Sequence, residues 1–246
     1  MLNIEKETEN CINWIKDYFK NNGPDSKMII GISGGKDSSV CAALGVKALG
    51  KDRILGVLMP NNIQSDIDDS LKLCKHLDIN YITINIGDTY NELCKQFYRE
   101  LDVNLKSTFT TNTPARLRMT TLYGVAAMTN GRVVNTSNLS EGICGWGTLW
   151  GDTVGDFAPI RNFLVNEVVQ IGDYLKLPME LTHKTPSDGM SGKSDEDNLG
   201  FSYNLVEEWF LNNKSIDKKY EKVSDRYNKY IWKSKLINIP SYEPTR

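Results

Sequence analysis

The chain of 246 residues contains only two histidines, His76 and His183, and neither has a companion at the spacing of metal ligands. A mechanism built on several imidazoles is therefore excluded. The five cysteines include no Cys-x-x-Cys pair, which argues against a zinc site and against a disulfide framework. We expect the cysteines to be reduced residues of the interior.

The sequence also lacks long apolar runs and any strong excess of one charge. No apolar stretch approaches the ~18 residues of a membrane span, and the first ten residues, MLNIEKETEN, are polar and charged. The net charge of -2 argues against the broad basic face that binds nucleic acid without regard to sequence. We expect a cytoplasmic protein that binds neither a membrane nor nucleic acid.

Composition and length indicate an ordinary globular protein. Hydrophobic residues make up 40% of the chain and charged residues 24%, which is not the balance of a disordered protein. A chain of this length is typical of one α/β domain with a sizeable core. We therefore expect a single domain over residues 1–246, with a helical segment at its C-terminal end.

Predicted strands and helices alternate along most of the chain. Short apolar runs predict strands at 28–32, 54–59, 81–86 and 132–136. Helical periodicity and capping residues predict helices at 4–20, 38–49, 66–77, 88–101, 114–128 and 217–235. Alternation of this kind builds right-handed βαβ units. The expected fold is doubly wound α/β, with a mostly parallel sheet flanked by helices.

The stretch IIGISGGKDSSV follows the first predicted strand and carries more polar chemistry than a turn needs. It matches neither the Walker A pattern nor the Gly-x-Gly-x-x-Gly fingerprint of dinucleotide sites. Two glycines, Gly34 and Gly35, let backbone amides approach an anion at the start of a helix. Asp37 beside such an anion makes sense if Mg²⁺ lies between them. The alternative is a tight turn in which Asp37 and Ser38 only cap the helix.

Two later segments are too rich in glycine and acid for regular elements. Residues 141–156, EGICGWGTLWGDTVGD, contain five glycines and predict a functional loop. Residues 189–193 lie in a second stretch of this kind, SDGMSGKSDED, which we expect to be mobile.

The Ser-Gly-Gly-x-Asp-Ser motif resembles the pyrophosphate-binding loop of the N-type ATP pyrophosphatases, which split ATP into AMP and pyrophosphate. Further stretches resemble the ammonia-dependent NAD synthetases within that group. These are ILGVLMP, NTPARLRM, VVNTSNLSEGICGWGTLWGD, DFAPI and KTPSDG, followed by SDEDNLGFSY. The similarity runs from residue 29 to residue 203, and several motifs in one order are more specific than one loop.

The resemblance implies a role for each matching residue. Asp37 and Glu141 are expected to bind Mg²⁺ and to be the catalytic pair. The expected ATP-binding residues are Gly31, Ile32, Ser33, Gly34, Gly35, Lys36, Asp37, Ser38, Met59, Thr136 and Ser187. The expected residues for deamido-NAD are Arg116, Asp156 and Lys184. An arginine suits a pyrophosphate because its planar fork can bind two oxygens. Glu141 and Arg116 could instead be ordinary surface charges.

The reaction implied is attack of a carboxylate on ATP to give an acyl-adenylate, after which ammonia displaces AMP and leaves an amide. Positioning and charge neutralisation would suffice, without a covalent enzyme nucleophile. The chain has no spare segment for a glutamine-hydrolysing domain, so the expected donor is ammonia. Mg²⁺ is the expected cofactor and ATP the co-substrate. The resemblance also implies a homodimer.

Several basic residues of the family pattern are missing. Leu149 and Val165 stand where the family has lysines, and no His-Lys-Arg cluster precedes Pro240. Four nearby cations could replace them, namely Arg161, Lys184, Lys193 and Lys235. The departures leave two alternatives open. One is a related ammonia ligase acting on a different carboxylate, and the other is a non-catalytic nucleotide-binding protein with the same fold.

Overall fold

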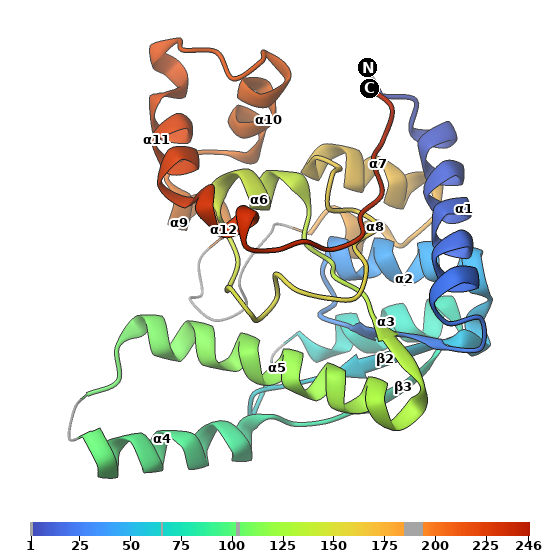
Figure 1. Cartoon of the computed structure of the whole chain (residues 1–246), viewed down its shortest axis with the longest axis vertical. Helices are drawn as coiled ribbons and strands as arrows, with labels where there is room; N and C mark the ends of the chain where they lie inside the picture. The colour runs from blue at the N-terminus through green and yellow to red at the C-terminus, as the bar shows by residue number, and fades with distance from the viewer. Residues whose placement is uncertain (1, 65, 102–103, 185–193) are drawn as a thin grey trace.

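The computed structural model describes residues 2–64, 66–101, 104–184 and 194–246. A central sheet is covered by helices on both faces (Figure 1), with α1 and α2 on one face and α5 on the other, while α4 packs along the projecting part of α5. The C-terminal helices form a separate group at one end of the sheet. The expected doubly wound α/β fold is therefore confirmed. The expected extent of the single domain, residues 1–246, stays a prediction.

The sheet consists of four parallel strands in the order β3-β2-β1-β4. Their bounds are Lys27–Gly31 for β1, Ile54–Leu58 for β2, Asn80–Thr83 for β3 and Gly131–Val133 for β4. In the register, Ile29 of β1 pairs with Leu55 of β2 and with Val133 of β4. Each observed strand overlaps the predicted one but ends earlier. The residues after the strand ends are thereby left to form loops at the carboxyl edge.

The helices account for most of the chain. The longer ones are α1 (Ile4–Asn22), α2 (Lys36–Leu49), α3 (Ile67–Leu77), α4 (Gly87–Leu101), α5 (Ser107–Thr129), α7 (Val165–Tyr174), α10 (Tyr203–Leu211) and α11 (Glu221–Tyr230). The short ones are α6 (Leu139–Cys144), α8 (Met179–Thr182), α9 (Asp195–Leu199) and α12 (Trp232–Lys235), with 3₁₀ turns at Lys51–Arg53 and Lys218–Tyr220.

Alternation along β1 divides the core into two layers. Met28 and Ile30 belong to the buried cluster that α1, α2, α3 and α7 complete, whereas Ile29 belongs to the cluster under α5. Side chains of a strand point alternately to opposite faces, so a strand covered on both sides must be apolar throughout. A third cluster, which includes Ile143 and Val206, joins α6 to the C-terminal helices.

Two expectations about element boundaries were wrong. Helix α5 begins at Ser107, seven residues before the predicted start, and contains Pro114 in its interior. Its polar first turns are anchored by Phe109, which packs on the ring of Phe97 in α4 at 5.4 Å. Residues 141–144 are helical, because Asn138 and Glu141 form a capping box that begins α6. Tertiary packing and a cap thus extend helices into stretches that lack apolar periodicity.

None of the helices in the described ranges is long and apolar enough to cross a membrane. The five cysteines are free thiols, and four of them are buried. The burial of Cys11, Cys41, Cys74 and Cys144 agrees with the expectation of interior thiols, whereas Cys94 is only partly buried.

Phe157 is the central side chain of the aromatic group beneath α1. It is fully buried and packs on Tyr18 at 4.7 Å and on Phe19 at 5.3 Å between ring centroids. We predict that Phe157→Ala lowers the free energy of unfolding by about 3–5 kcal/mol, because it leaves a cavity in close-packed surroundings. Urea denaturation measures the change. Ile216→Ala, at a fully exposed position, is the control and should change stability by less than about 0.5 kcal/mol. Equal losses in the two variants would contradict this packing.

Candidate functional site

The candidate site lies at the carboxyl ends of β1 and β4. Strand β1 lies between β2 and β4, and the helices that connect to these two neighbours cover opposite faces of the sheet. In open α/β sheets, ligands bind at the carboxyl edge where the connections diverge in this way. The loop 32–35 leaves β1 at this point, and the segment 134–138 leaves β4 beside it.

The glycine loop is held in shape by its own serines. The hydroxyls of Ser33 and Ser38 lie 3.1 Å apart, and the Ser38 hydroxyl also donates to the Gly35 carbonyl at 3.1 Å. The backbone amide of Gly35 in turn donates to the Ser33 hydroxyl at 3.3 Å. Helix α2 begins at Lys36, so its positive end faces the loop. The arrangement suits an anion such as a phosphate.

Gly34 is fixed by close packing against α3. Its φ is +78°, and a Cβ added there would lie 2.7 Å from Cβ of Asp69 and 3.0 Å from the Ser70 backbone nitrogen. The Ser70 hydroxyl donates to the Ile32 carbonyl at 3.0 Å, which ties α3 to the same loop. Only glycine combines this backbone conformation with this close approach.

Asn138 connects the two predicted metal-binding acids. Its side-chain amide donates to Oδ1 of Asp37 at 3.0 Å, and its side-chain oxygen accepts from the Glu141 backbone amide at 3.0 Å. The backbone amide of Asn138 donates to Oε2 of Glu141 at 3.2 Å. Asn138 is buried, so it is a fixed link between the first turn of α2 and the first turn of α6. The sequence analysis missed this residue, although the Asn-x-x-Glu spacing of a capping box was visible in it.

Lys36 contributes a buried positive charge to this group. Its ammonium donates to Oδ2 of Asp37 at 2.8 Å, and the residue is only 5% exposed. Burial by itself lowers the pKa of Lys36, but the negative charges of Asp37 and Glu141 and the hydrogen bond to Asp37 outweigh it, so the pKa is raised. Lys36 is therefore held as a cation next to the glycine loop.

Glu141 is partly buried and lies close to other negatively charged side chains. Burial raises its pKa well above the usual range, and the charge of Asp37 raises it further, while Lys36 acts in the opposite direction. Asp195, at the start of α9, adds to the negative charge. A divalent cation next to Asp37 and Glu141 would relieve this repulsion.

The donor set fits Mg²⁺ bound together with phosphate. No group of three or more His, Cys, Asp or Glu side chains within the described ranges could hold a metal ion on its own. Mg²⁺ usually binds one or two carboxylates and completes its shell with water and substrate phosphates. Asp37 and Glu141 provide two such carboxylates beside a phosphate-shaped loop, so the fit is chemically sound.

Other residues expected at ATP lie around the same edge of the sheet. Met59 follows β2, and its methyl group lies against Gly31, at 3.1 Å from the position that a Cβ would take there. Its carbonyl accepts from Nε of Arg118 at 3.0 Å. Thr136 lies in the segment between β4 and Asn138. Ser187 lies outside the described residues, so its ATP-binding role stays a prediction. Lys193, one of the cations that could replace the missing lysines, also lies outside them.

Lys184 lies close to the glycine loop but is already paired. Its ammonium binds the carboxylates of Asp66 at 2.9 Å and Asp69 at 2.7 Å. Asp69 is the residue that packs against Gly34. A role of Lys184 in substrate binding stays a prediction, and it would require a ligand that competes with two carboxylates.

The other predicted substrate residues have structural partners. Nε of Arg116 donates to the Leu149 carbonyl at 3.2 Å, which joins α5 to the loop after α6. Asp156 accepts from the Val133 backbone amide at 2.7 Å and from the Tyr123 hydroxyl at 3.3 Å. No hydrogen bond among the described residues links Arg116 or Asp156 to Asp37, Asn138 or Glu141. Their assignment to the substrate stays a prediction.

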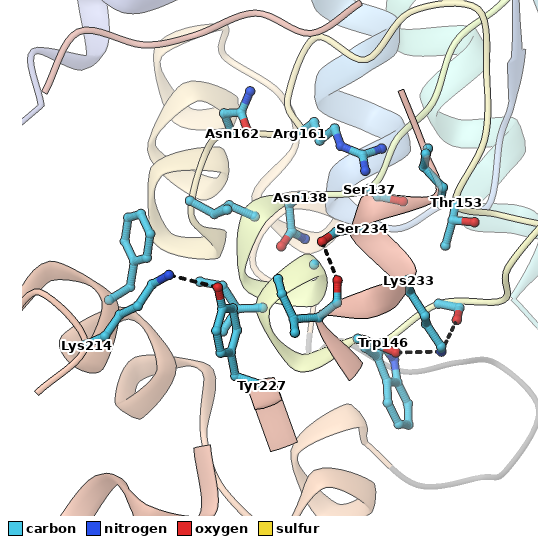
Figure 2. Close-up of a pocket in the computed structure, with 18 residues that line it drawn as sticks. Ser137, Asn138, Trp146, Thr153, Arg161, Asn162, Lys214, Tyr227, Lys233 and Ser234 are labelled. Carbon is cyan, nitrogen blue, oxygen red and sulfur yellow. Dashed lines mark hydrogen bonds between the residues drawn. The ribbon is translucent and has the colours of Figure 1, made fainter. Parts of the chain in front are cut away.

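A cavity of about 230 Å³ lies on the other side of Asn138, between α6 and the C-terminal helices. Figure 2 shows Ser137, Asn138 and Thr153 on one wall and Tyr227 and Lys214 on another. Arg161 and Lys233 also line it. Asn138 lines this cavity and also binds Asp37, so the cavity and the acid pair share this residue.

Comparison with known proteins now decides the family. The profile of the NAD synthase family matches residues 7–236. The chain belongs to the NAD synthase family. A curated member, the NH(3)-dependent NAD(+) synthetase of Thermococcus sibiricus, is 39% identical over 202 residues, which cover 82% of this chain and 78% of the relative.

Two solved structures of related proteins superpose on this member of the NAD synthase family. The NMN synthetase from Francisella tularensis superposes with a TM-score of 0.86 and 31% identity, covering 98% of this chain and all of the other. The NH3-dependent NAD synthetase from Campylobacter jejuni, in complex with the nitrate ion, gives a TM-score of 0.76 and 28% identity, covering 99% and 100%. The family resemblance expected from the motifs is thus confirmed.

The conformation of Gly34 leads to a test of the glycine loop. We predict that Gly34→Ala lowers the affinity for magnesium-ATP by at least about 10-fold, because the added methyl group displaces the loop from α3. Isothermal titration calorimetry with a non-cleavable ATP analogue measures this affinity.

Gly50→Ala is the matched control for that variant. Gly50 has a similar φ of +83°, but no atom lies within 4 Å of the position of its Cβ. Both variants should lose about 1–3 kcal/mol of stability from the backbone conformation. Only Gly34→Ala should lose ATP affinity, so equal ATP binding by the two variants would contradict a phosphate site at this loop.

Proposed function

We propose that the protein is an ammonia-dependent ligase that converts deamido-NAD to NAD, with cleavage of ATP to AMP and pyrophosphate. The observation that carries the proposal is the placement of Asp37 and Glu141 at the first turns of two helices, joined by Asn138, beside a phosphate-shaped loop. Membership of the NAD synthase family supports it. A protein that only binds a nucleotide does not need two carboxylates connected in this way.

The loop and its buried lysine bind the phosphates of ATP in this proposal. The glycine loop lies at the positive end of α2 and faces the anion, and the ammonium of Lys36 neutralises part of its charge. Met59 and Thr136 border the nucleotide at the ends of β2 and β4. Pyrophosphate is a good leaving group only when its developing charge is stabilised, and the fixed charges provide that stabilisation without reorganising.

Asp37 and Glu141 would hold Mg²⁺, which supplies Lewis-acid polarisation of the ATP phosphates when it is bound. The link through Asn138 keeps the two carboxylates oriented before the ligand arrives. Burial, together with the charge of Asp37, raises the pKa of Glu141, so the ionised acid pair is disfavoured without a cation. Metal-bound ATP is therefore favoured over free ATP at this position.

The chemistry takes two displacements. A carboxylate oxygen of the acceptor attacks the α-phosphorus of ATP, and the bond to pyrophosphate breaks. Nitrogen of ammonia then attacks the acyl carbon, AMP leaves with the former carboxylate oxygen, and the nitrogen loses a proton. The protein contributes orientation and charge, so no covalent nucleophile is needed. This fits a chain whose thiols at Cys41 and Cys144 are buried, with pKa values raised mainly by burial.

A second candidate acceptor is the mononucleotide, nicotinate mononucleotide. The Francisella NMN synthetase superposes with a TM-score of 0.86, against 0.76 for the Campylobacter NAD synthetase. Leu149 and Val165 replace family lysines, and Val165 is buried in the cluster with Ile143, so no cation of this chain occupies that place directly. Fewer cations suit an acceptor with one phosphate better than one with two.

The proposal also includes a homodimer in the cytoplasm. Support for a second subunit comes from large apolar side chains that are exposed together near the end of α4, namely Phe97 at 37%, Tyr98 at 50% and Leu101 at 60% exposure. Contiguous exposed apolar surface of this kind usually marks a contact. Sedimentation equilibrium distinguishes a dimer from a monomer.

The decisive assay uses purified protein with magnesium-ATP, ammonium and either deamido-NAD or nicotinate mononucleotide. We predict that AMP and the amide product form in equal amounts with one of the two acceptors. We further predict that Asp37→Asn reduces this activity by at least about 100-fold, because a charged metal ligand is lost. Chromatography of the nucleotides follows both products.

Asp68→Asn is the control, since Asp68 is an exposed acid in the first turn of α3 and the substitution also removes one negative charge. It should keep the wild-type rate. Amide formation from nicotinate mononucleotide alone would replace deamido-NAD by the second candidate. ATP binding without AMP release under either condition would contradict a ligase and favour a non-catalytic nucleotide-binding protein.

A further inference from the structure

Arg161 is a cation without a partner in the described part of the chain. It lines the cavity of about 230 Å³ behind Asn138 and is partly buried. Figure 2 shows its guanidinium directed towards Ser137 and the interior of the cavity. It forms no hydrogen bond or ion pair with any described residue. A partly desolvated charge without a partner costs free energy, and an anionic ligand would reduce that cost.

A second positive charge faces the same cavity. The ammonium of Lys233 donates to the carbonyls of Gly145 at 2.9 Å and Gly147 at 3.0 Å, both in the loop after α6. These partners are neutral, so the charge of Lys233 is not cancelled by a carboxylate within hydrogen-bond distance in the described ranges. Burial lowers the pKa of both Arg161 and Lys233. An oxyanion between them would favour the charged form of each.

The location of the cavity connects it to the ATP site. Asn138 lines the cavity and donates to Asp37, and Gly142 and Gly145 line it on the side of α6. The cavity and the predicted phosphate site are therefore neighbours that share Asn138. The aromatic rings of Trp146 and Tyr227 provide apolar wall against which a flat heterocycle can pack.

The volume limits what can enter. About 230 Å³ lies below the ~300 Å³ at which pockets for drug-sized ligands begin. A pyridine ring with one oxyanion is of suitable size, whereas the rest of the acceptor would have to extend outside the cavity.

We propose that this cavity receives the pyridine ring and one oxyanion of the acceptor and that Arg161 is its specificity-determining cation, binding a carboxylate or phosphate oxyanion through its planar fork. This inference rests on the proposed function, since it assigns the acceptor of that reaction to a place. Arg161 and Lys233 replace the charge that the chain lacks at Leu149 and Val165. Substitution of Arg161 tests the proposal more directly than substitution of Lys233, because Lys233 also holds the loop after α6.

The test compares Arg161→Gln with the wild type and with Arg161→Lys. Binding of nicotinate mononucleotide and of deamido-NAD is measured by calorimetry in the presence of a non-cleavable ATP analogue and magnesium. We expect Arg161→Gln to raise the Kd of the acceptor by at least about 10-fold, the loss of one charge-assisted hydrogen bond, and Arg161→Lys to recover part of the loss. The Kd of the ATP analogue should change by less than about twofold.

Lys16→Gln is the matched control. Lys16 is exposed on α1, which contributes no residue to the cavity, and the substitution also removes one positive charge. It should leave acceptor affinity unchanged. Nicotinamide mononucleotide, which has the phosphate but no carboxylate, shows which oxyanion Arg161 binds.

The outcomes test the cavity assignment and the proposed function separately. Unchanged acceptor affinity in Arg161→Gln, or a loss confined to the ATP analogue, overturns the inference and leaves the proposed function standing. Acceptor binding that depends on Arg161, in a wild-type protein that forms no amide, supports the cavity assignment and overturns the proposed function. A wild-type protein that binds neither acceptor overturns both.

Discussion

The hydrogen bond from Asn138 to Asp37 joins the two halves of the site, and the rest of the arrangement depends on it. Asp37 follows β1 through the glycine loop, whereas Glu141 follows β4, more than a hundred residues later in the chain. The parallel register of β1 and β4 places both strand ends at one edge. Asn138 then fixes the distance between the two first turns, because it also caps the helix that carries Glu141.

This arrangement concentrates negative charge where folding alone would avoid it. Burial and the charge of Asp37 raise the pKa of Glu141, and the charge of Lys36 acts against them. Strongly perturbed pKa values are frequent at functional sites. In the proposed function, a bound divalent cation and polyphosphate would compensate this cost to the folded protein. Arg161, which has no hydrogen-bond or ion-pair partner among the described residues, is the corresponding positive charge in the neighbouring cavity.

Much of the fold could be predicted from sequence, because the pattern of apolar residues differs between strands and helices. Buried strands such as β1 read as continuous apolar runs, and the glycine loop reads as an anion site. The start of α5 could not be predicted, since it depends on Phe109 packing against another helix. Likewise, resemblance could point to Asp37 and Glu141, but Asn138 emerged only when the two strand ends were placed side by side. Side-chain partners at long sequence separation are a property of the packing, which periodicity does not encode.

The central claim is that Asp37 and Glu141 act as one unit on magnesium-ATP, and a double-mutant cycle tests it most directly. The quantity measured is the Kd of a non-cleavable magnesium-ATP analogue for the wild type, Asp37→Asn, Glu141→Gln and the double variant. Residues that share one ligand are strongly non-additive. The account predicts that each single substitution loses nearly as much affinity as both together. Losses that simply add, or a single substitution without effect, would contradict it.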